Sequence, residues 1–131
     1  MGRNRVIILD TCALLWLAAG SDRLTADARK RIDTEAIVAV SAISAFEIAL
    51  KYRDGKLGLP LPPGDWWSRV IDHHRVDVLP LEPETLFTAA NLPQIHKDPA
   101  DRCIIATAFI HKASVATTDE RFADYGVSTI Y

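Results

Sequence analysis

Five carboxylates stand where strands and helices are expected to begin or end. Asp10 and Asp119 each follow a short apolar run. Glu47 falls in the first turn of a predicted helix, and Asp98 and Asp101 open another. Clustered carboxylates raise one another's pKa, and a bound divalent cation relieves that repulsion. Because the set is rich in acids and poor in histidine, it favours Mg²⁺ or Mn²⁺ over zinc. Two such ions, roughly 3.5–4 Å apart, can activate a water in phosphodiester cleavage.

Each acid also has an ordinary structural explanation. Glu47 completes a capping box with Ser44. Asp98 precedes a proline, as N-caps commonly do, and Asp101 lies in a first helical turn, where the helix dipole favours any acid. Asp119 can cap the short turn that follows it. Asp10, at the end of an apolar strand, is the hardest to explain by a structural role alone. The five acids together are stronger evidence for a site than any one of them.

Hydrophobic periodicity alternates between strand and helix along the chain. Short β-branched runs predict strands, and apolar residues at helical spacing predict helices. Thr25, Ser44 and Asp65 are the expected N-caps of three helices, and Pro83 and Pro99 fit first helical turns. Strands are expected at residues 5–9, 37–40, 76–79, 114–117 and, at an edge, 127–130; helices are expected at about 12–18, 25–32, 44–54, 65–71, 83–91 and 99–111.

This alternation determines the expected fold. Strands separated by helices form right-handed βαβ units, which build a parallel sheet covered on both faces. We therefore expect residues 1–131 to form one α/β domain, a three-layer α/β/α sandwich around a mainly parallel sheet of four to five strands. Ligands bind beyond the carboxyl ends of such strands. Asp10, Glu47 and Asp119 reach that rim by βα geometry, whereas Asp98 and Asp101 reach it only if their helix begins there.

The composition is typical of a soluble protein and argues against several other classes of protein. Hydrophobic residues make up 49% and charged residues 24%, which is normal for a soluble domain. The formal net charge of −2 excludes binding of nucleic acid through bulk positive charge. Arg3 and Arg5 precede an apolar run like that of a signal peptide, but Asp10 and Thr11 interrupt it. The longest apolar stretch, residues 12–19, is too short to span a membrane, so we expect a cytoplasmic protein.

The cysteines and histidines do not indicate a second catalytic or metal-binding site. Cys12 and Cys103 lie in no CxxC or Cys/His cluster, so we expect small buried side chains without a disulfide or zinc. No Ser/His/Asp or Cys/His set is evident, which argues against a covalent nucleophile. His73 and His74 are expected to face solvent. His96 is interpreted as a loop histidine without a catalytic role, with contact to phosphate as the alternative.

Four segments, in register and covering nearly the whole chain, carry a family resemblance. They are LDTCALLW (9–16), SAISAFEIALK (41–51) with GKL (55–57), HKDPADR (96–102) with IIA (104–106), and TTDERF (117–122). The chain resembles the PIN-domain ribonucleases, specifically the VapC-type toxins of bacterial toxin–antitoxin pairs. Two positions depart from that pattern, Phe46 in place of a common Trp and Ala100 in place of a common Phe; both are expected to be structural.

The resemblance assigns roles to the acids. It implies a catalytic quartet of Asp10, Glu47, Asp101 and Asp119, in which Asp10, Asp101 and Asp119 hold the metal and Glu47 acts directly or through water. It favours Asp101 over Asp98, because Asp101 is the second acid of the DPxDR motif. Asp98 is then a helix cap that adds negative potential.

The resemblance also indicates supporting and substrate-binding residues. Thr11 and Thr118 match hydroxyl positions that orient carboxylates or waters. Lys51, one turn after Glu47, and Arg102, beside the third acid, are candidate phosphate contacts; pairing with an acid is the alternative for Arg102.

Partners follow from the same resemblance. It implies structured RNA, often tRNA, as substrate, a homodimer, and an antitoxin whose tail covers the site. Of Trp66 and Trp67, at most one is expected in the core, which leaves the other for an interface. Two other classes of protein stay open: a phosphoacceptor signalling domain with the same kind of fold, and a catalytically inert α/β interaction module.

Overall fold

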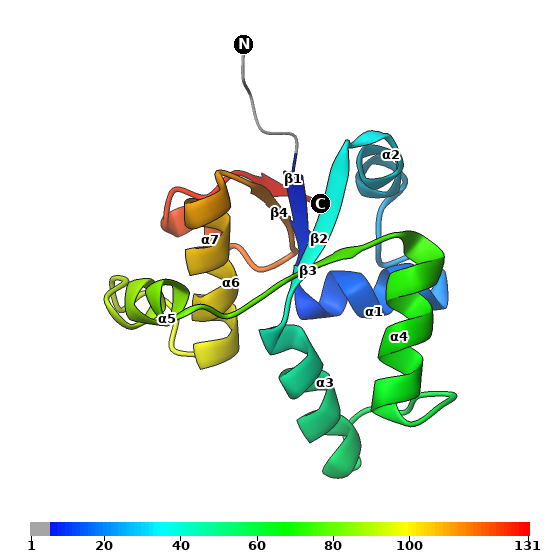
Figure 1. The fold of residues 1–131 in the computed structure, drawn as a ribbon. Coiled ribbons are helices and arrows are strands. Elements are labelled where there is room, and N and C mark those ends of the chain that lie inside the picture. The colour runs from blue at the N-terminus through cyan, green and yellow to red at the C-terminus, as the bar shows by residue number, and fades with distance from the viewer. Residues whose placement is uncertain (1–5) are drawn as a thin grey trace.

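The sheet of this computed structural model has five parallel strands in the order β3-β2-β1-β4-β5 (Figure 1). The structure describes residues 6–131; Arg3 and Arg5, and with Arg5 the first residue of the predicted first strand, lie outside the described residues. The elements are β1 (Val6–Leu9), α1 (Thr11–Ala19), α2 (Ala26–Thr34), β2 (Ile37–Ser41), α3 (Ile43–Arg53), α4 (Pro63–His74), β3 (Asp77–Leu79), α5 (Pro83–Ala90), α6 (Pro99–His111), β4 (Ser114–Ala116), α7 (Arg121–Asp124) and β5 (Thr129–Ile130).

Strand β1 lies in the middle of the sheet and is buried on both faces. Ile7 and Leu9 point to one face and Ile8 to the other, as the two-residue period of a strand requires. Leu9 lies beside Val40 of β2 and Ala116 of β4 in the ladder. Because these strands are parallel and in register, the residues that follow them share one edge of the sheet.

Helices cover both faces, which confirms the predicted α/β/α sandwich (Figure 1). On one face α1, α2 and α4 contribute Leu14, Ile32 and Trp66 to the core. On the other face α6 and α7 contribute Ile104 and Phe122, and α5 packs against the outside of α6. Trp66 is buried and Trp67 only partly so, as the sequence predicted.

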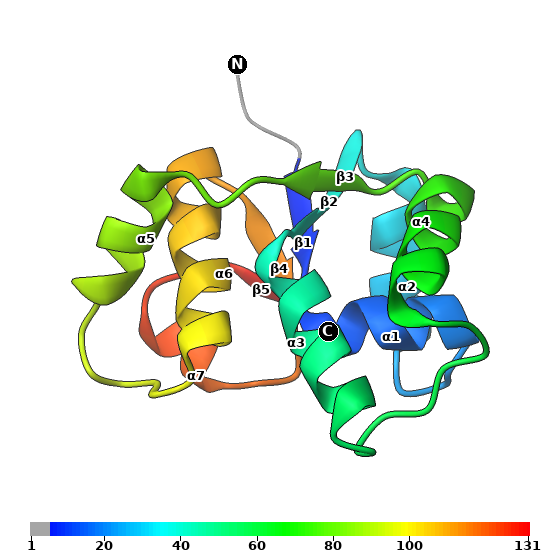
Figure 2. The ribbon, with the colours of Figure 1, turned by 60° about the horizontal axis from the view of Figure 1, so that its bottom comes forward.

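Helix α3 stands beyond the carboxyl edge of the sheet, between the helices of the two faces (Figure 2). It packs against α1, α4 and α6. It therefore brings residues of its first turns close to those that follow β1 and to the start of α6.

Several helix ends follow the predicted chemistry. Gly20, with φ +64°, ends α1 in the left-handed conformation that glycine adopts without strain. The Thr25 hydroxyl accepts a 3.1 Å hydrogen bond from the backbone N–H of Ala28 at the start of α2. Pro83 begins α5 as expected.

Two predicted caps are wrong. Helix α3 starts at Ile43 with Ala42 at its N-cap and no side-chain cap, so Ser44 lies inside the helix. Helix α4 starts at Pro63, which places Asp65 in its first turn rather than at its cap. The helix therefore begins two residues earlier than expected, because proline fits a first helical turn. Across residues 6–131, none of the helices has both the length and the apolar surface that a bilayer crossing requires.

Candidate active site

Asp10 lies in the turn between β1 and α1, at the carboxyl edge of the sheet. Its Oδ1 accepts a 2.7 Å hydrogen bond from the backbone N–H of Ala13, so it is the N-cap of α1. Burial raises the pKa of Asp10 above its usual value, and the charges of Glu47 and Asp119 add to this, against hydrogen bonds from Thr117 and Ala13. The carboxylate is thus a cap that also faces other acids.

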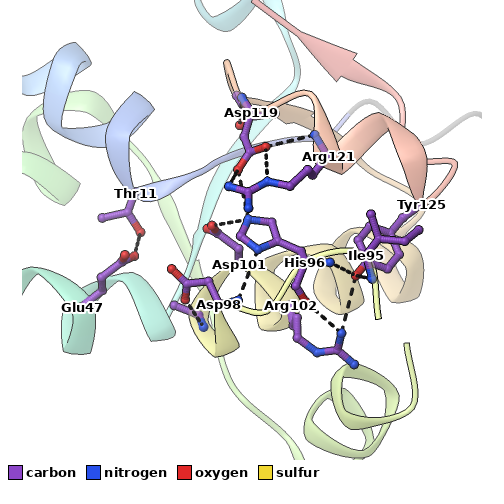
Figure 3. A network of polar contacts seen from close by, with 12 residues as sticks. Thr11, Glu47, Ile95, His96, Asp98, Asp101, Arg102, Asp119, Arg121 and Tyr125 are labelled. Carbon is purple, nitrogen blue, oxygen red and sulfur yellow. Dashed lines mark hydrogen bonds and ion pairs between the residues drawn. The ribbon is translucent and has the colours of Figure 1, made fainter. Parts of the chain in front are cut away.

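Glu47 points towards the same group of acids, called the pocket below, instead of capping its own helix. The Thr11 hydroxyl donates to Oε1 of Glu47 at 2.5 Å, and Ser44 Oγ lies 2.8 Å from the same Thr11 oxygen (Figure 3). Because Thr11 gives its proton to Glu47, Ser44 donates to Thr11. Lys51 Nζ lies 3.4 Å from Oε2 of Glu47. The capping-box interpretation of Ser44 and Glu47 is therefore wrong: the pair is joined across helices, through Thr11 of α1.

The start of α6 lies at the sheet edge, which the sequence left undecided. Asp98 caps this helix as predicted, with Oδ1 accepting from the backbone N–H of Ala100 at 2.9 Å. Asp101, one turn on, points into the pocket. Burial, followed by the negative charges of Asp98, Glu47, Asp10 and Asp119 in that order, raises the pKa of Asp101 to about 7. Asp101 therefore lies close to the other four acids, and Asp98 adds negative potential as expected.

Asp119 follows β4 and is tied to an arginine that the sequence analysis did not single out. Its Oδ1 accepts from the backbone N–H and from Nε of Arg121, each at 3.0 Å, and its Oδ2 accepts from Nη2 at 2.9 Å (Figure 3). These bonds, with a further one from His96, lower the pKa of Asp119 to about 2. The local turn-capping role proposed for Asp119 is present, alongside its position in the pocket.

His96 lies in the loop before α6, as expected, and its ring contacts two acids of the site. It is only 3% exposed, and its Nε2 is 2.9 Å from Oδ2 of Asp101 and 3.0 Å from Oδ2 of Asp119. Its Nδ1 accepts a hydrogen bond from the backbone N–H of Asp98 at 3.2 Å. The ring proton therefore sits on Nε2, so His96 donates to the acids. Two signals in the sequence were its place two residues before a helix cap and its place at the start of the HKDPADR segment.

Arg102 does not face the pocket, which corrects its prediction as a phosphate contact. Its guanidinium is buried and donates to backbone carbonyls, those of Ala89, Ala90, Leu92, Pro93 and His96. Within residues 6–131 it pairs with no acid either. Because an arginine supplies five fixed donors, it can hold a turning segment of backbone whose carbonyls converge. Arg102 thus anchors the loop that carries His96.

Tyr125 secures the same loop from the other side (Figure 3). Its hydroxyl donates to the carbonyl of Pro93 at 2.7 Å and accepts from the backbone N–H groups of Ile95 and His96, at 3.2 and 2.7 Å. Three hydrogen bonds to one hydroxyl fix both sides of the loop. The position of the His96 ring follows from this anchoring.

The supporting hydroxyl after β4 belongs to Thr117 and not to Thr118. Thr118 is exposed, whereas Thr117 is buried, bonds Asp10 and accepts from the backbone N–H of Asp119 at 3.0 Å. Among the cysteines, Cys103 is buried as expected but Cys12 is exposed, and both thiols are free.

The donor set fits a hard divalent cation. His96, Asp101 and Asp119 bring a nitrogen and two carboxylate oxygens within 4.8 Å of one another, but the proton on Nε2 removes the lone pair that a metal would need. The oxygens of Asp10, Glu47, Asp101 and Asp119 remain as ligands. Oxygen-only ligation is what Mg²⁺ and Mn²⁺ prefer. The pKa of Asp101 is raised mainly by burial and further by four neighbouring carboxylates, whose repulsion a bound cation would relieve.

Comparison with known proteins agrees with this arrangement of acids on this sheet. The PIN domain profile matches residues 7–127 of the chain. The chain belongs to the PIN domain family. The family resemblance inferred from the four segments is thereby confirmed, and the phosphoacceptor alternative, which rested on the fold alone, is not supported.

Individual relatives cover nearly all of this PIN domain. It is 32% identical over 120 residues to Ribonuclease VapC22 of Mycobacterium tuberculosis, across 91% of each chain. Its fold is similar to that of VapBC2 from Rickettsia felis bound to a promoter DNA fragment, with a TM-score of 0.70, 14% identity and coverage of 95% of this chain and 97% of that one. A toxin–antitoxin complex from Klebsiella pneumoniae gives a TM-score of 0.66, 16% identity and coverage of 95% and 96%.

Proposed function

We propose that this PIN domain is a metal-dependent endoribonuclease, the toxin of a toxin–antitoxin pair, which hydrolyses a phosphodiester of structured RNA such as tRNA. The observation that supports it most directly is the convergence of Asp10, Glu47, Asp101 and Asp119 at the carboxyl edge of the sheet. The similarity to a named ribonuclease over 91% of the chain supports the reaction class.

The four acids have different proposed roles at the metal site. Asp10, Asp101 and Asp119 would hold one or two Mg²⁺ or Mn²⁺ ions, with Glu47 bound directly or through water. When bound, the metal supplies an activated water and balances charge on the phosphate. Thr11 fixes one oxygen of Glu47, and His96 donates from Nε2 to Asp119 and lies equally close to Asp101, so both acids are oriented before any metal arrives.

Lys51 is the proposed phosphate contact on the α3 side. Its side chain is 43% exposed and lies one turn from the pocket acid Glu47, with which it forms a 3.4 Å ion pair. An exposed pair of this kind is weak, so Lys51 can exchange Glu47 for a phosphate oxygen at little cost.

Proposed protein partners are a cognate antitoxin and a second copy of this chain. The structural neighbours from Rickettsia felis and Klebsiella pneumoniae are toxin–antitoxin complexes, which supports the first. We expect the toxin, its antitoxin and the RNA to meet in the cytoplasm.

The experiment is an RNA cleavage assay with purified protein, with Mg²⁺ or Mn²⁺ and with EDTA. Asp101→Asn removes one pocket carboxylate at nearly constant size, and Asp33→Asn, an exposed acid on α2, is the matched control. Cleavage that needs metal, survives Asp33→Asn and is lost in Asp101→Asn supports the proposal. Cleavage in EDTA, or full activity of Asp101→Asn, contradicts it.

A further inference from the structure

Arg121 occupies both oxygens of a predicted metal ligand. It lies at the start of α7, two residues after Asp119, and its side chain is 54% exposed. Its backbone N–H and Nε bond Oδ1 of Asp119, and Nη2 bonds Oδ2 at 2.9 Å. Asp119 raises the pKa of Arg121, with smaller contributions from Asp101 and Asp98, so the guanidinium faces the acids of the pocket as well (Figure 3).

A metal and Arg121 compete for the same lone pairs. Oδ1 of Asp119 already accepts two bonds from Arg121, and Oδ2 accepts one from Arg121 and one from His96. A carboxylate oxygen has two lone pairs, so a metal at Asp119 must displace one of these donors. The His96 ring is buried and held by its loop, whereas the Arg121 side chain is exposed on the surface. Arg121 is the donor that can leave.

A displaced guanidinium would stand beside the place where a phosphate must bind. Its planar fork matches two phosphate oxygens. Among the cations described here, Arg102 is buried against carbonyls and Lys51 lies on the Glu47 side, so Arg121 is the arginine exposed beside Asp101 and Asp119.

The geometry points to Arg121 as a built-in competitor of the metal at Asp119, whose guanidinium, once released by metal binding, takes a phosphate oxygen of the substrate. The competition between Arg121 and a metal for Asp119 involves only this chain and a cation. The contact between Arg121 and a substrate phosphate rests on the proposed function.

Mn²⁺ binding to the metal-free protein tests the competition without any RNA. Arg121→Ala should bind Mn²⁺ about two- to five-fold more tightly by calorimetry, because an exposed ion pair no longer has to open. Arg121→Lys should fall between Arg121→Ala and the wild type. Arg53→Ala is the matched control: Arg53 also pairs through Nε with a neighbouring acid, Asp54, at 3.0 Å, but at 70% exposure and outside the pocket. Unchanged or weaker Mn²⁺ binding by a folded Arg121→Ala protein would overturn the competition.

RNA kinetics at saturating Mn²⁺ test the phosphate contact. Arg121→Ala should raise KM for RNA roughly tenfold or more, as expected when a charged hydrogen-bond partner is removed, with a smaller change in kcat. Arg121→Lys should recover part of that loss and Arg53→Ala should have no effect. An unchanged KM would overturn the phosphate contact. If the wild type cleaves no RNA under any metal condition, the proposed function and the phosphate contact fail together, while the Mn²⁺ titration still decides the competition. If Arg121→Ala does not fold, Arg121→Lys carries both tests.

Discussion

Two neighbouring acids of the pocket, Asp101 and Asp119, have pKa values that are shifted in opposite directions. Asp101 and Asp119 both approach Nε2 of His96, at 2.9 and 3.0 Å. Yet the pKa of Asp101 is raised to about 7, and that of Asp119 is lowered to about 2. Asp101, on α6, is partly buried near four other carboxylates, whereas Asp119, after β4, accepts from the guanidinium and the backbone N–H of Arg121. One acid lacks a cation and the other already has one, so a metal relieves repulsion at the first and displaces a partner at the second.

The largest effect should come from removing the uncompensated acid. Because the pKa of Asp101 in the folded state lies near 7 and that of an unfolded Asp near 3.8, the folded state holds the extra proton between these values. Stability of the metal-free protein should therefore fall as pH rises from about 4 to about 7, by on the order of 4 kcal/mol from this group. Urea unfolding in EDTA should show a flatter pH profile for Asp101→Asn. Asp33→Asn should keep the wild-type profile, and an equally steep decline in Asp101→Asn would show that the charge crowding lies elsewhere.

Asp119 should give the opposite pH dependence. Its folded pKa of about 2 lies below the unfolded value, so its stabilisation is complete above about pH 4 and is lost as pH falls towards 2. This contribution should be smaller than that of Asp101, because water screens a carboxylate paired at the surface. Acid unfolding followed by circular dichroism should show a smaller loss for Asp119→Asn across that range. If Asp119→Asn loses as much stability at low pH as the wild type, the bonds from Arg121 and His96 do not stabilise the charged form of Asp119.

Loosening the loop of His96 should disturb both acids at once. Tyr125→Phe removes a hydroxyl that bonds Pro93, Ile95 and His96, and should cost about 1–2 kcal/mol of unfolding free energy. Tyr131→Phe, on an exposed ring, should cost nothing measurable. The ¹⁵N shift of His96 Nε2 should change in Tyr125→Phe and not in the control; an unchanged shift would show that Arg102 alone holds the loop.

The smallest effect belongs to the Glu47 side. Lys51→Ala breaks an exposed ion pair and should change stability by less than about 1 kcal/mol, while raising KM for RNA a few-fold with kcat nearly constant. Lys30→Ala, another exposed lysine, on α2, is the control. If Lys51→Ala lowers kcat and kcat/KM equally, with KM unchanged, the side chain acts in the chemical step and the proposed phosphate contact is wrong.

The sequence predicted what local patterns encode. Five strands, their common edge, the acids Asp10 and Asp119 and the cap Asp98 all follow from periodicity and βα geometry. Ser44 and Glu47 matched a local capping pattern, but contacts with Thr11, more than thirty residues away, decided their partners.

The arginines and His96 show the limit of spacing arguments. Arg102 stands beside an acid in the sequence, yet its direction on α6 aims it at the carbonyls of a loop. His96 is placed by a hydroxyl 29 residues further along the chain. No role was predicted for Arg121, whose bonds to Asp119 become distinctive only where the acids come together. Such roles depend on how separate segments pack, which no local pattern records.

Metal occupancy and RNA cleavage, measured on the same samples, test the central claim most directly. Wild-type protein freed of metal is titrated with Mn²⁺, and bound Mn²⁺ per chain is compared with the rate of RNA cleavage, beside Asp101→Asn. The acid pocket predicts that cleavage is absent without metal, rises in step with occupancy, and is lost together with tight Mn²⁺ binding in Asp101→Asn. Cleavage that proceeds before any Mn²⁺ binds, or that persists in Asp101→Asn, would contradict it.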